Sequence, residues 1–253
     1  DAESLGRDDI PDYLSISFSA TDYIGHYFGP SSLEYEDNLM HLDATLAALF
    51  KRVDQTVGLS KTLIILSSDH GTPEAFEWLK AHGIPTGRLN PDKLDLAPLY
   101  GELEKRFGAG QPLVAKIQLP WVYLNHPLIE EKGLDAASVA RTVAAFFEKV
   151  EGIAAAVPTE DLINGHLTST PLNRQILANF FPGRSGDIHL ISNINWHMEG
   201  GSDRLVALHG SPWGYDTWVP LIFAGPGLLP HSVFRKVETI DVAPTLSARI
   251  GCQ

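Results

Sequence analysis

Three short clusters of aspartate and histidine stand out in the sequence, each before or after a predicted strand. They are Asp22-x-x-x-His26, Asp69-His70 and His209-Gly210-Ser211-Pro212. Carboxylate oxygens and imidazole nitrogens are ligands that zinc takes in proteins, at distances of about 2.0–2.2 Å. These five side chains exceed the three protein ligands of a single catalytic zinc with an open position. The clusters therefore predict a site for two zinc ions, an arrangement suited to displacement at phosphorus.

Each cluster taken alone also fits a simpler interpretation. Asp69-His70 before a glycine is compatible with an ordinary turn, and so is His209-Gly210. Asp22 and His26 are compatible with a loop carboxylate and a surface histidine. The metal hypothesis depends on the three clusters together, each beside a predicted strand. His197 stays open because it follows a predicted strand. The remaining histidines are interpreted as surface or packing residues: His41, His82, His126, His166, His189 and His231.

The stretch Lys61–Gly71, KTLIILSSDHG, shows how one cluster is positioned. It begins with a short apolar run rich in β-branched residues, which predicts a strand buried on both faces of a sheet. Asp69 and His70 follow just past the end of that strand, where open α/β sheets place their ligands. Gly71 lets the backbone turn sharply at this point.

The segment before this stretch predicts a parallel βαβ unit. Residues 12–20 alternate between apolar and polar side chains, as in a strand, and the glycines and proline of residues 21–30 indicate a loop. Ser31 or Ser32 then caps a long amphipathic helix. Because this helix leads into the predicted strand at Lys61–Leu66, the two strands are expected to be parallel.

The rest of the chain alternates predicted helices and strands, with no internal repeat. Helices are expected over residues 73–82, 96–107, 136–150, 171–179 and 239–250, and extended segments over residues 113–124, 154–164, 188–196 and 219–224. This order favours an inserted subdomain of the α+β type. The predicted division is residues 1–83 for part of a metal-binding α/β core, 84–186 for the inserted subdomain and 187–253 for the return to the core.

Composition limits the classes of partner. The 253 residues are 44% hydrophobic and 20% charged, as in soluble globular proteins. With 19 Lys and Arg against 31 Asp and Glu, the net charge is −12, which argues against a nucleic-acid-binding surface or an anionic membrane surface. An anionic small molecule stays compatible, because a bound cation inverts the local field. The single Cys252 excludes an intrachain disulfide and a thiolate zinc cage. No apolar stretch reaches the ~18–20 residues of a transmembrane segment.

The motifs resemble those of a known family. They read S-x-x-D-Y-x-G-H-x-x-G-P over Ser19–Pro30, S-D-H-G over Ser68–Gly71, H-G-S-P over His209–Pro212, V-P-L-I-F-A-G-P-G over residues 219–227 and T-I-D-V-A-P-T-L over Thr239–Leu246. In this order they are similar to the alkaline phosphatase superfamily, in its type I phosphodiesterase/nucleotide pyrophosphatase branch and especially its bacterial phosphate-irrepressible alkaline phosphatases. The resemblance implies an α/β fold with a mostly parallel central sheet flanked by helices, and a centre with two Zn²⁺ ions.

The resemblance also implies how the ligands divide. Asp22, His26 and His209 are expected to hold one zinc, and Asp69 and His70 the other. In the family a further Asp ligand, a Thr or Ser nucleophile and the Lys, Arg and Asn phosphate binders precede the D-Y-x-G-H motif.

The nucleophile is therefore expected upstream of Asp1, the first residue of the chain. Only 21 residues precede Asp22, and none of them fits the family's upstream roles with the expected spacing. We expect no catalytic nucleophile in this chain, and an N-terminal part of the fold that likewise lies upstream of Asp1.

The expected activity follows from the same resemblance. The intact parent protein is expected to hydrolyse monoesters of phosphate on small molecules through a phosphorylated Thr or Ser, in the periplasm or outside the cell. Two alternatives stay open: a phosphodiesterase or nucleotide pyrophosphatase of the same superfamily, and a truncated chain that is catalytically inactive. The sequence leaves the oligomeric state and the leaving group undetermined.

Overall fold

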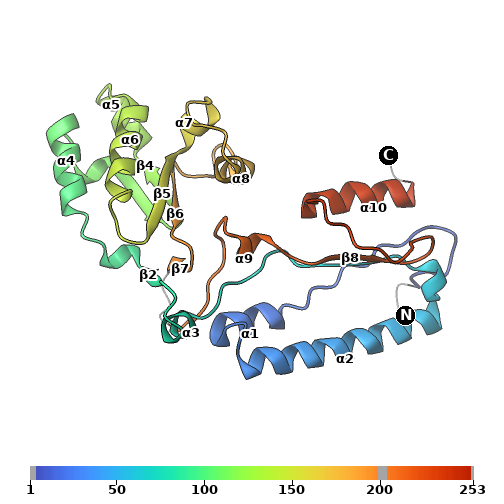
Figure 1. Ribbon diagram of the computed structural model, residues 1–253. Coiled ribbons are helices and arrows are strands. Elements are labelled where there is room, and N and C mark those ends of the chain that lie inside the picture. The colour runs from blue at the N-terminus through green and yellow to red at the C-terminus, as the bar shows by residue number, and fades with distance from the viewer. Residues whose placement is uncertain (1–3, 199–203, 252–253) are drawn as a thin grey trace.

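The computed structural model describes residues 4–198 and 204–251, which form two regions of different shape (Figure 1). The compact region, residues 91–192, packs helices against a four-stranded sheet. The extended region, residues 4–71 and 204–251, is built from one long helix, several short helices and a two-stranded ribbon. Residues 72–90 and 193–198 connect the two regions.

The extended region begins with two helices that pack against each other. Its elements in chain order are α1 Ala20–Phe28, α2 Leu33–Thr56, the 3₁₀ turn η1 Leu59–Lys61, β1 Ile64–Ser67, α9 Gly214–Thr217, β8 Leu221–Ala224, the 3₁₀ turn η4 Thr239–Asp241 and α10 Val242–Ile250. The predicted cap of the long helix is confirmed, because the Ser32 hydroxyl accepts a hydrogen bond from the Tyr35 amide at 3.1 Å. Glu34 and Glu36 lie in the first turn of α2, where the helix dipole favours negative charge.

Three predictions for this region are wrong. Residues 12–20 form no strand; they are mostly exposed, and no strand in the described part of the chain pairs with them. The predicted loop at residues 21–30 is largely the helix α1. The predicted buried strand, β1, is only partly covered and pairs antiparallel with β8, with Ile64 opposite Ala224 and Ser67 opposite Leu221. The predicted parallel βαβ unit is therefore not formed among the described residues.

The compact region contains the larger sheet. Its strands are β3 Val114–Gln118, β4 Trp121–Leu124, β5 Ile153–Pro158 and β6 Ile188–Ser192, in the order β3-β4-β6-β5 with antiparallel pairing. Its helices are α4 Ala97–Phe107, α5 His126–Glu131, α6 Ala136–Phe147, α7 Thr159–Ile163 and α8 Pro171–Asn179, with the 3₁₀ turns η2 Pro91–Lys93 and η3 Gln111–Leu113. Fully buried Leu99, Leu103, Val143, Phe147 and Ile188 form the core between helices and sheet.

Short elements connect the two regions: α3 Phe76–Ala81, β2 Gly87–Leu89 and β7 Trp196–Met198. Strands β2 and β7 pair in parallel, with Arg88 opposite His197. Among the described residues this is the one parallel pairing, and the other strand pairs are antiparallel. These pairings therefore do not show the mostly parallel central sheet that the resemblance implies. Among the helices that the structure describes, none combines the length and the apolar character needed to cross a membrane.

Most predicted helices are confirmed, and the α/β class is confirmed with them. The segment predicted as one strand over residues 154–164 is instead β5 followed by α7. The extended segment predicted over residues 188–196 is β6 only as far as Ser192, and all five residues of β6 are buried. The domain division stays a prediction; β6 lies in the same sheet as β3, β4 and β5, just beyond the predicted boundary at residue 186.

Two residues named in the sequence predictions lie outside the described residues. They are Asp1, upstream of which the nucleophile is expected, and Cys252. The expectation attached to Asp1 is therefore not tested by the structure and stays a prediction.

Candidate metal centre

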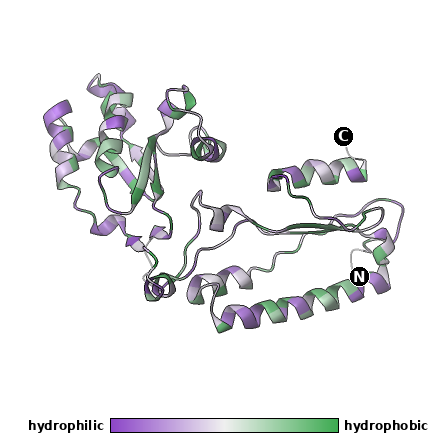
Figure 2. Cartoon of the chain, viewed as in Figure 1, coloured by the Kyte–Doolittle hydropathy of each residue, from purple (hydrophilic) through white to green (hydrophobic). Residues whose placement is uncertain are grey.

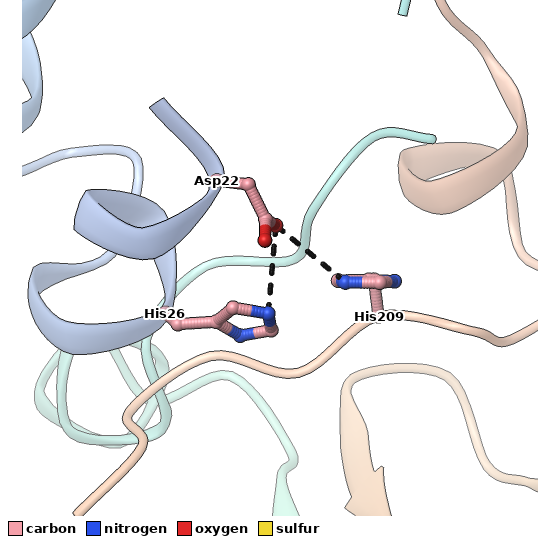
Figure 3. Close-up of side chains that lie close together, drawn as sticks. All are labelled: Asp22, His26 and His209. Carbon is pink, nitrogen blue, oxygen red and sulfur yellow. Dashed lines mark ion pairs between the residues drawn. The ribbon is translucent and has the colours of Figure 1, made fainter. Parts of the chain in front are cut away.

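Asp22, His26 and His209 point toward one another at the end of α1 (Figure 3). The Asp22 Oδ1 atom lies 3.4 Å from His26 Nε2 and 3.6 Å from His209 Nε2. One ligand atom from each of the three residues lies within 4.8 Å of the others. A carboxylate oxygen and two imidazole nitrogens at this spacing form a donor set that fits a zinc ion.

The second predicted pair lies directly beside this group. His70 Nε2 is 3.8 Å from Asp22 Oδ1 and 3.7 Å from Asp69 Oδ2. The rings of His70 and His209 are stacked, with their centroids 3.3 Å apart. The Asp69 side chain is 87% exposed and borders the group on its solvent side. The structure thus brings all five predicted residues together, while their roles as metal ligands stay a prediction.

The helix α1 explains the first half of this geometry. Asp22 and His26 are four residues apart, so one turn of helix places both side chains on the same face. Gly25 lies between them, and a Cβ there would come 3.3 Å from the Tyr35 ring, so glycine lets α1 pack closely on α2. The sequence does not predict this helix, because Gly25 and Gly29-Pro30 indicate a loop.

Backbone contacts bring His209 to α1. The amides of Val206 and Ala207 donate to the His26 carbonyl at 2.8 and 3.3 Å, which fixes the segment before His209 against the end of the helix. The His26 Nδ1 atom lies 2.7 Å from the Ala207 carbonyl oxygen. Because a carbonyl only accepts, Nδ1 is the donor in this contact, and Nε2 is the ring nitrogen that faces Asp22.

His70 is oriented in the same way. Its Nδ1 atom lies 3.0 Å from the Gly71 carbonyl oxygen, so Nδ1 is the donor there and Nε2 faces Asp22. A hydrogen bond from the second ring nitrogen to a backbone carbonyl is the usual support of a metal-binding histidine. Both orientations are therefore compatible with metal binding.

The electrostatics of the group favour neutral imidazole at His209. Partial burial lowers the pKa of His209, and the neighbouring His70 and His26 lower it further, while Asp22 and Asp69 oppose the change. A neutral imidazole is the form that binds a metal ion. Next to the group, burial and the Asp22 charge raise the pKa of Tyr35, so that its hydroxyl stays protonated near neutral pH.

The other histidines lie outside this group. His197 is buried on β7, in the connection between the two regions. His189 is buried on β6 and stacks on Trp121, with the ring centroids 4.2 Å apart, which agrees with a packing role.

One residue near the group was missed at the level of sequence. Asp216 is a buried residue of α9 whose side chain accepts hydrogen bonds from the segment after His209. The sequence predictions do not single it out, although its side-chain partners Gly210 and Ser211 precede it by only six and five residues.

Comparison with known proteins shows the protein family to which the chain belongs. A family model described as Type I phosphodiesterase / nucleotide pyrophosphatase matches residues 1–213. The match covers most of the chain, so the chain belongs to the type I phosphodiesterase/nucleotide pyrophosphatase family, as the motifs predict.

Individual relatives agree with this membership. The chain is 29% identical to alkaline phosphatase PafA of Elizabethkingia meningoseptica over 257 residues, which is 100% of this chain and 45% of the relative. It is 30% identical to alkaline phosphatase PhoV of Synechococcus elongatus, over 100% of this chain and 44% of the relative. A Myroides odoratus protein named calcium-transporting ATPase is 32% identical over 97% of this chain and 44% of its own length.

The fold agrees as well. The crystal structure of wild-type PafA superposes with a TM-score of 0.85 at 29% identity, over 98% of this chain and 46% of that one. The chain thus spans slightly less than half the length of the relatives it matches, and it has the fold of the corresponding part of an alkaline phosphatase.

Proposed function

We propose that this chain supplies most of a two-zinc centre that hydrolyses monoesters of phosphate on small molecules. The observation that carries the proposal is the convergence of Asp22, His26 and His209, with both Nε2 atoms facing one carboxylate oxygen. Membership of the family and similarity to two alkaline phosphatases support the reaction class. A periplasmic or secreted location belongs to the same proposal.

The proposed division of ligands follows the geometry. Asp22, His26 and His209 would hold one zinc, a complete set of three protein ligands. Asp69 and His70 would hold the second, which needs a further ligand from outside this stretch. When bound, the ions supply positive charge that attracts a phosphate group and lowers the pKa of an oxygen nucleophile.

The chain's own residues prepare the site for this chemistry. The carbonyls of Ala207 and Gly71 hold the protons of His26 and His70 on Nδ1, away from Asp22. The chain as a whole carries a net charge of −12, which repels an anionic substrate in the absence of a cation. Substrate binding is therefore expected to require loaded metal.

We propose further that the nucleophile and the phosphate-binding residues come from a segment upstream of Asp1. Two observations support this: the chain spans 45% of PafA, and α2 has no buried residue along its 24 positions. The isolated 253 residues are then expected to bind metal and to turn over little or no phosphate ester.

The test is turnover of p-nitrophenyl phosphate by a protein that joins this chain to the upstream segment of its gene. We expect activity that a chelator abolishes, and a loss of at least about 100-fold in the His26→Ala variant, the upper end of the usual cost of disturbing a metal site. His41→Ala is the matched control, because His41 forms the same i,i+4 pair with Asp37 on an exposed face of α2, at 3.7 Å. Activity that survives chelation, or that falls equally in both variants, would contradict the proposal.

The family description favours one alternative, a phosphodiesterase. Bis-(p-nitrophenyl) phosphate separates the two, because a monoesterase and a diesterase differ in the phosphate-binding residues that contact the second ester group. A higher rate on the diester than on the monoester would assign the diesterase reaction.

A further inference from the structure

We propose that Asp216 is a positioning residue that fixes the loops of His70 and His209 relative to each other. This inference rests on the proposed metal centre and assigns a role to a residue outside the ligand set. Asp216 lies in the short helix α9 and is 4% exposed.

The Asp216 side chain organises the segment that follows His209. Its Oδ2 atom accepts hydrogen bonds from the Gly210 amide at 3.0 Å, the Ser211 amide at 2.7 Å and the Ser211 hydroxyl at 2.6 Å. Hydrogen bonds to a charged acceptor are stronger than those between neutral groups. Three donors on one carboxylate oxygen therefore hold the backbone next to His209 in one conformation.

The Asp216 backbone fixes the other loop. Its carbonyl oxygen accepts a hydrogen bond from the Gly71 amide at 2.8 Å, directly after His70. A Cβ on Gly71 would lie 2.0 Å from the Tyr215 carbonyl oxygen, so only glycine permits this approach. Asp216 thus hydrogen-bonds both to the segment after His209 and to the segment after His70. The rings of these two histidines are stacked, with their centroids 3.3 Å apart.

The compact region anchors α9 from its other side. The Trp213 indole donates to the Ser192 carbonyl at 2.9 Å, at the end of β6. The Tyr215 hydroxyl accepts from the Asn195 amide at 3.1 Å. Trp213 also packs against a small apolar cluster of the compact region. Asp216 is therefore held by the more deeply buried part of the molecule, which makes it a rigid reference for the two loops.

The carboxylate is costly to bury, which argues that packing alone does not explain it. Its Oδ1 atom has no hydrogen-bond partner among the residues that the structure describes. A buried charge with unused acceptor capacity usually lowers stability relative to an apolar residue of similar size. We infer from these contacts that the function of Asp216 is to set the distance between the loops of His70 and His209, and that this function offsets the loss of stability.

The test is cobalt(II) titration of the 253-residue chain, followed by the visible absorption of the bound ion, which reports the coordination geometry. In Asp216→Ala we expect at least about a tenfold loss of affinity and an altered spectrum, the usual scale for residues that support metal ligands. Asp216→Asn keeps the acceptor oxygen and the shape, so we expect it to recover most of the wild-type affinity and spectrum.

Asp161→Ala is the matched control, because Asp161 is 7% exposed and accepts two hydrogen bonds from Arg141 in the compact region. It should lower stability without changing the cobalt spectrum. If Asp216→Ala fails to fold, Ser211→Ala removes the hydroxyl donor and should give a smaller loss of affinity in the same direction. Wild-type affinity and spectrum in the Asp216 or Ser211 variants would overturn this inference alone, whereas absence of cobalt binding by the wild-type chain would overturn the proposed centre as well.

Discussion

The compact and extended regions differ in how they bury apolar surface. The compact region encloses Phe147, Leu103 and their neighbours completely between helices and sheet. In the extended region the long helix α2 alternates apolar and polar residues, as the green and purple bands of Figure 2 show, yet none of its residues is buried. Stability is thus concentrated in one region and the candidate metal ligands in the other.

Several large apolar side chains of the extended region are exposed. Phe234 is 95% exposed, Trp218 86%, Leu229 82% and Leu33 80%. The candidate metal ligands therefore lie in the region with more exposed apolar side chains, although Ile163 and Phe181 of the compact region are exposed as well.

The largest expected difference between the regions is in the free energy of unfolding that is lost when an apolar side chain is shortened to alanine. Phe147→Ala should lower the free energy of unfolding by about 3–5 kcal/mol, because it removes a fully buried ring from a close-packed core. Leu39→Ala on α2 should cost less than about 1 kcal/mol, because Leu39 is already largely exposed. Urea denaturation of both variants measures the two values.

Equal losses of unfolding free energy in the two variants would contradict this difference between the regions, since they would mean that α2 is covered in solution. The same two variants can be measured in the protein that joins this chain to the upstream segment of its gene. There we expect the cost of Leu39→Ala to rise while that of Phe147→Ala stays the same.

The next largest effect is a dependence of the free energy of unfolding on pH, which we attribute to His189 in the compact region. Burial lowers the pKa of His189 from 6.5 to about 4, so the unfolded chain binds a proton that the folded chain rejects between these values. The free energy of unfolding should therefore fall as the pH is lowered through this range, by about 3 kcal/mol in total. His189→Phe keeps a ring against Trp121 and should remove this part of the slope.

Chemical denaturation at several pH values measures the effect, and the difference between wild type and variant isolates His189 from other groups. Asp161 titrates in a separate range, because hydrogen bonds from Arg141 lower its pKa below the ordinary value of 3.8. Identical slopes for wild type and variant would show that His189 is not buried as a neutral ring.

The smallest effect concerns the N-terminus of α2. Ser32→Ala removes the acceptor for the Tyr35 amide and should weaken the first turns of the helix by about 1 kcal/mol. Thr45→Ala serves as the control, since the Thr45 hydroxyl donates back to the His41 carbonyl within the helix and alanine is the better helix former. Amide hydrogen exchange along α2 should speed up in the first variant and stay equal or slow down in the second.

Local signals account for what the sequence predicts well. The cap at Ser32 and the apolar period after it define α2, and Thr170 with Pro171 defines the start of α8. The five candidate ligands are identifiable because each belongs to a short motif of aspartate or histidine with a nearby glycine.

The features that the sequence did not predict depend mainly on tertiary contacts. The glycines of α1 indicate a loop until the Tyr35 ring that packs on Gly25 is known. A run as short as β1 does not specify its partner, so its antiparallel pairing with β8 has no local signature. The side-chain donors to Asp216 lie in its own segment, but its backbone contact with Gly71 joins a distant part of the chain and has no local signal.

Zinc titration of the 253-residue chain, with and without the His209→Ala substitution, tests the central claim most directly. The account predicts one tight site in the wild-type chain, which loss of one of its three ligands in His209→Ala weakens by at least about 100-fold, and a second site at Asp69 and His70 that is much weaker. Two equally tight sites, or a tight site that survives His209→Ala unchanged, would contradict it.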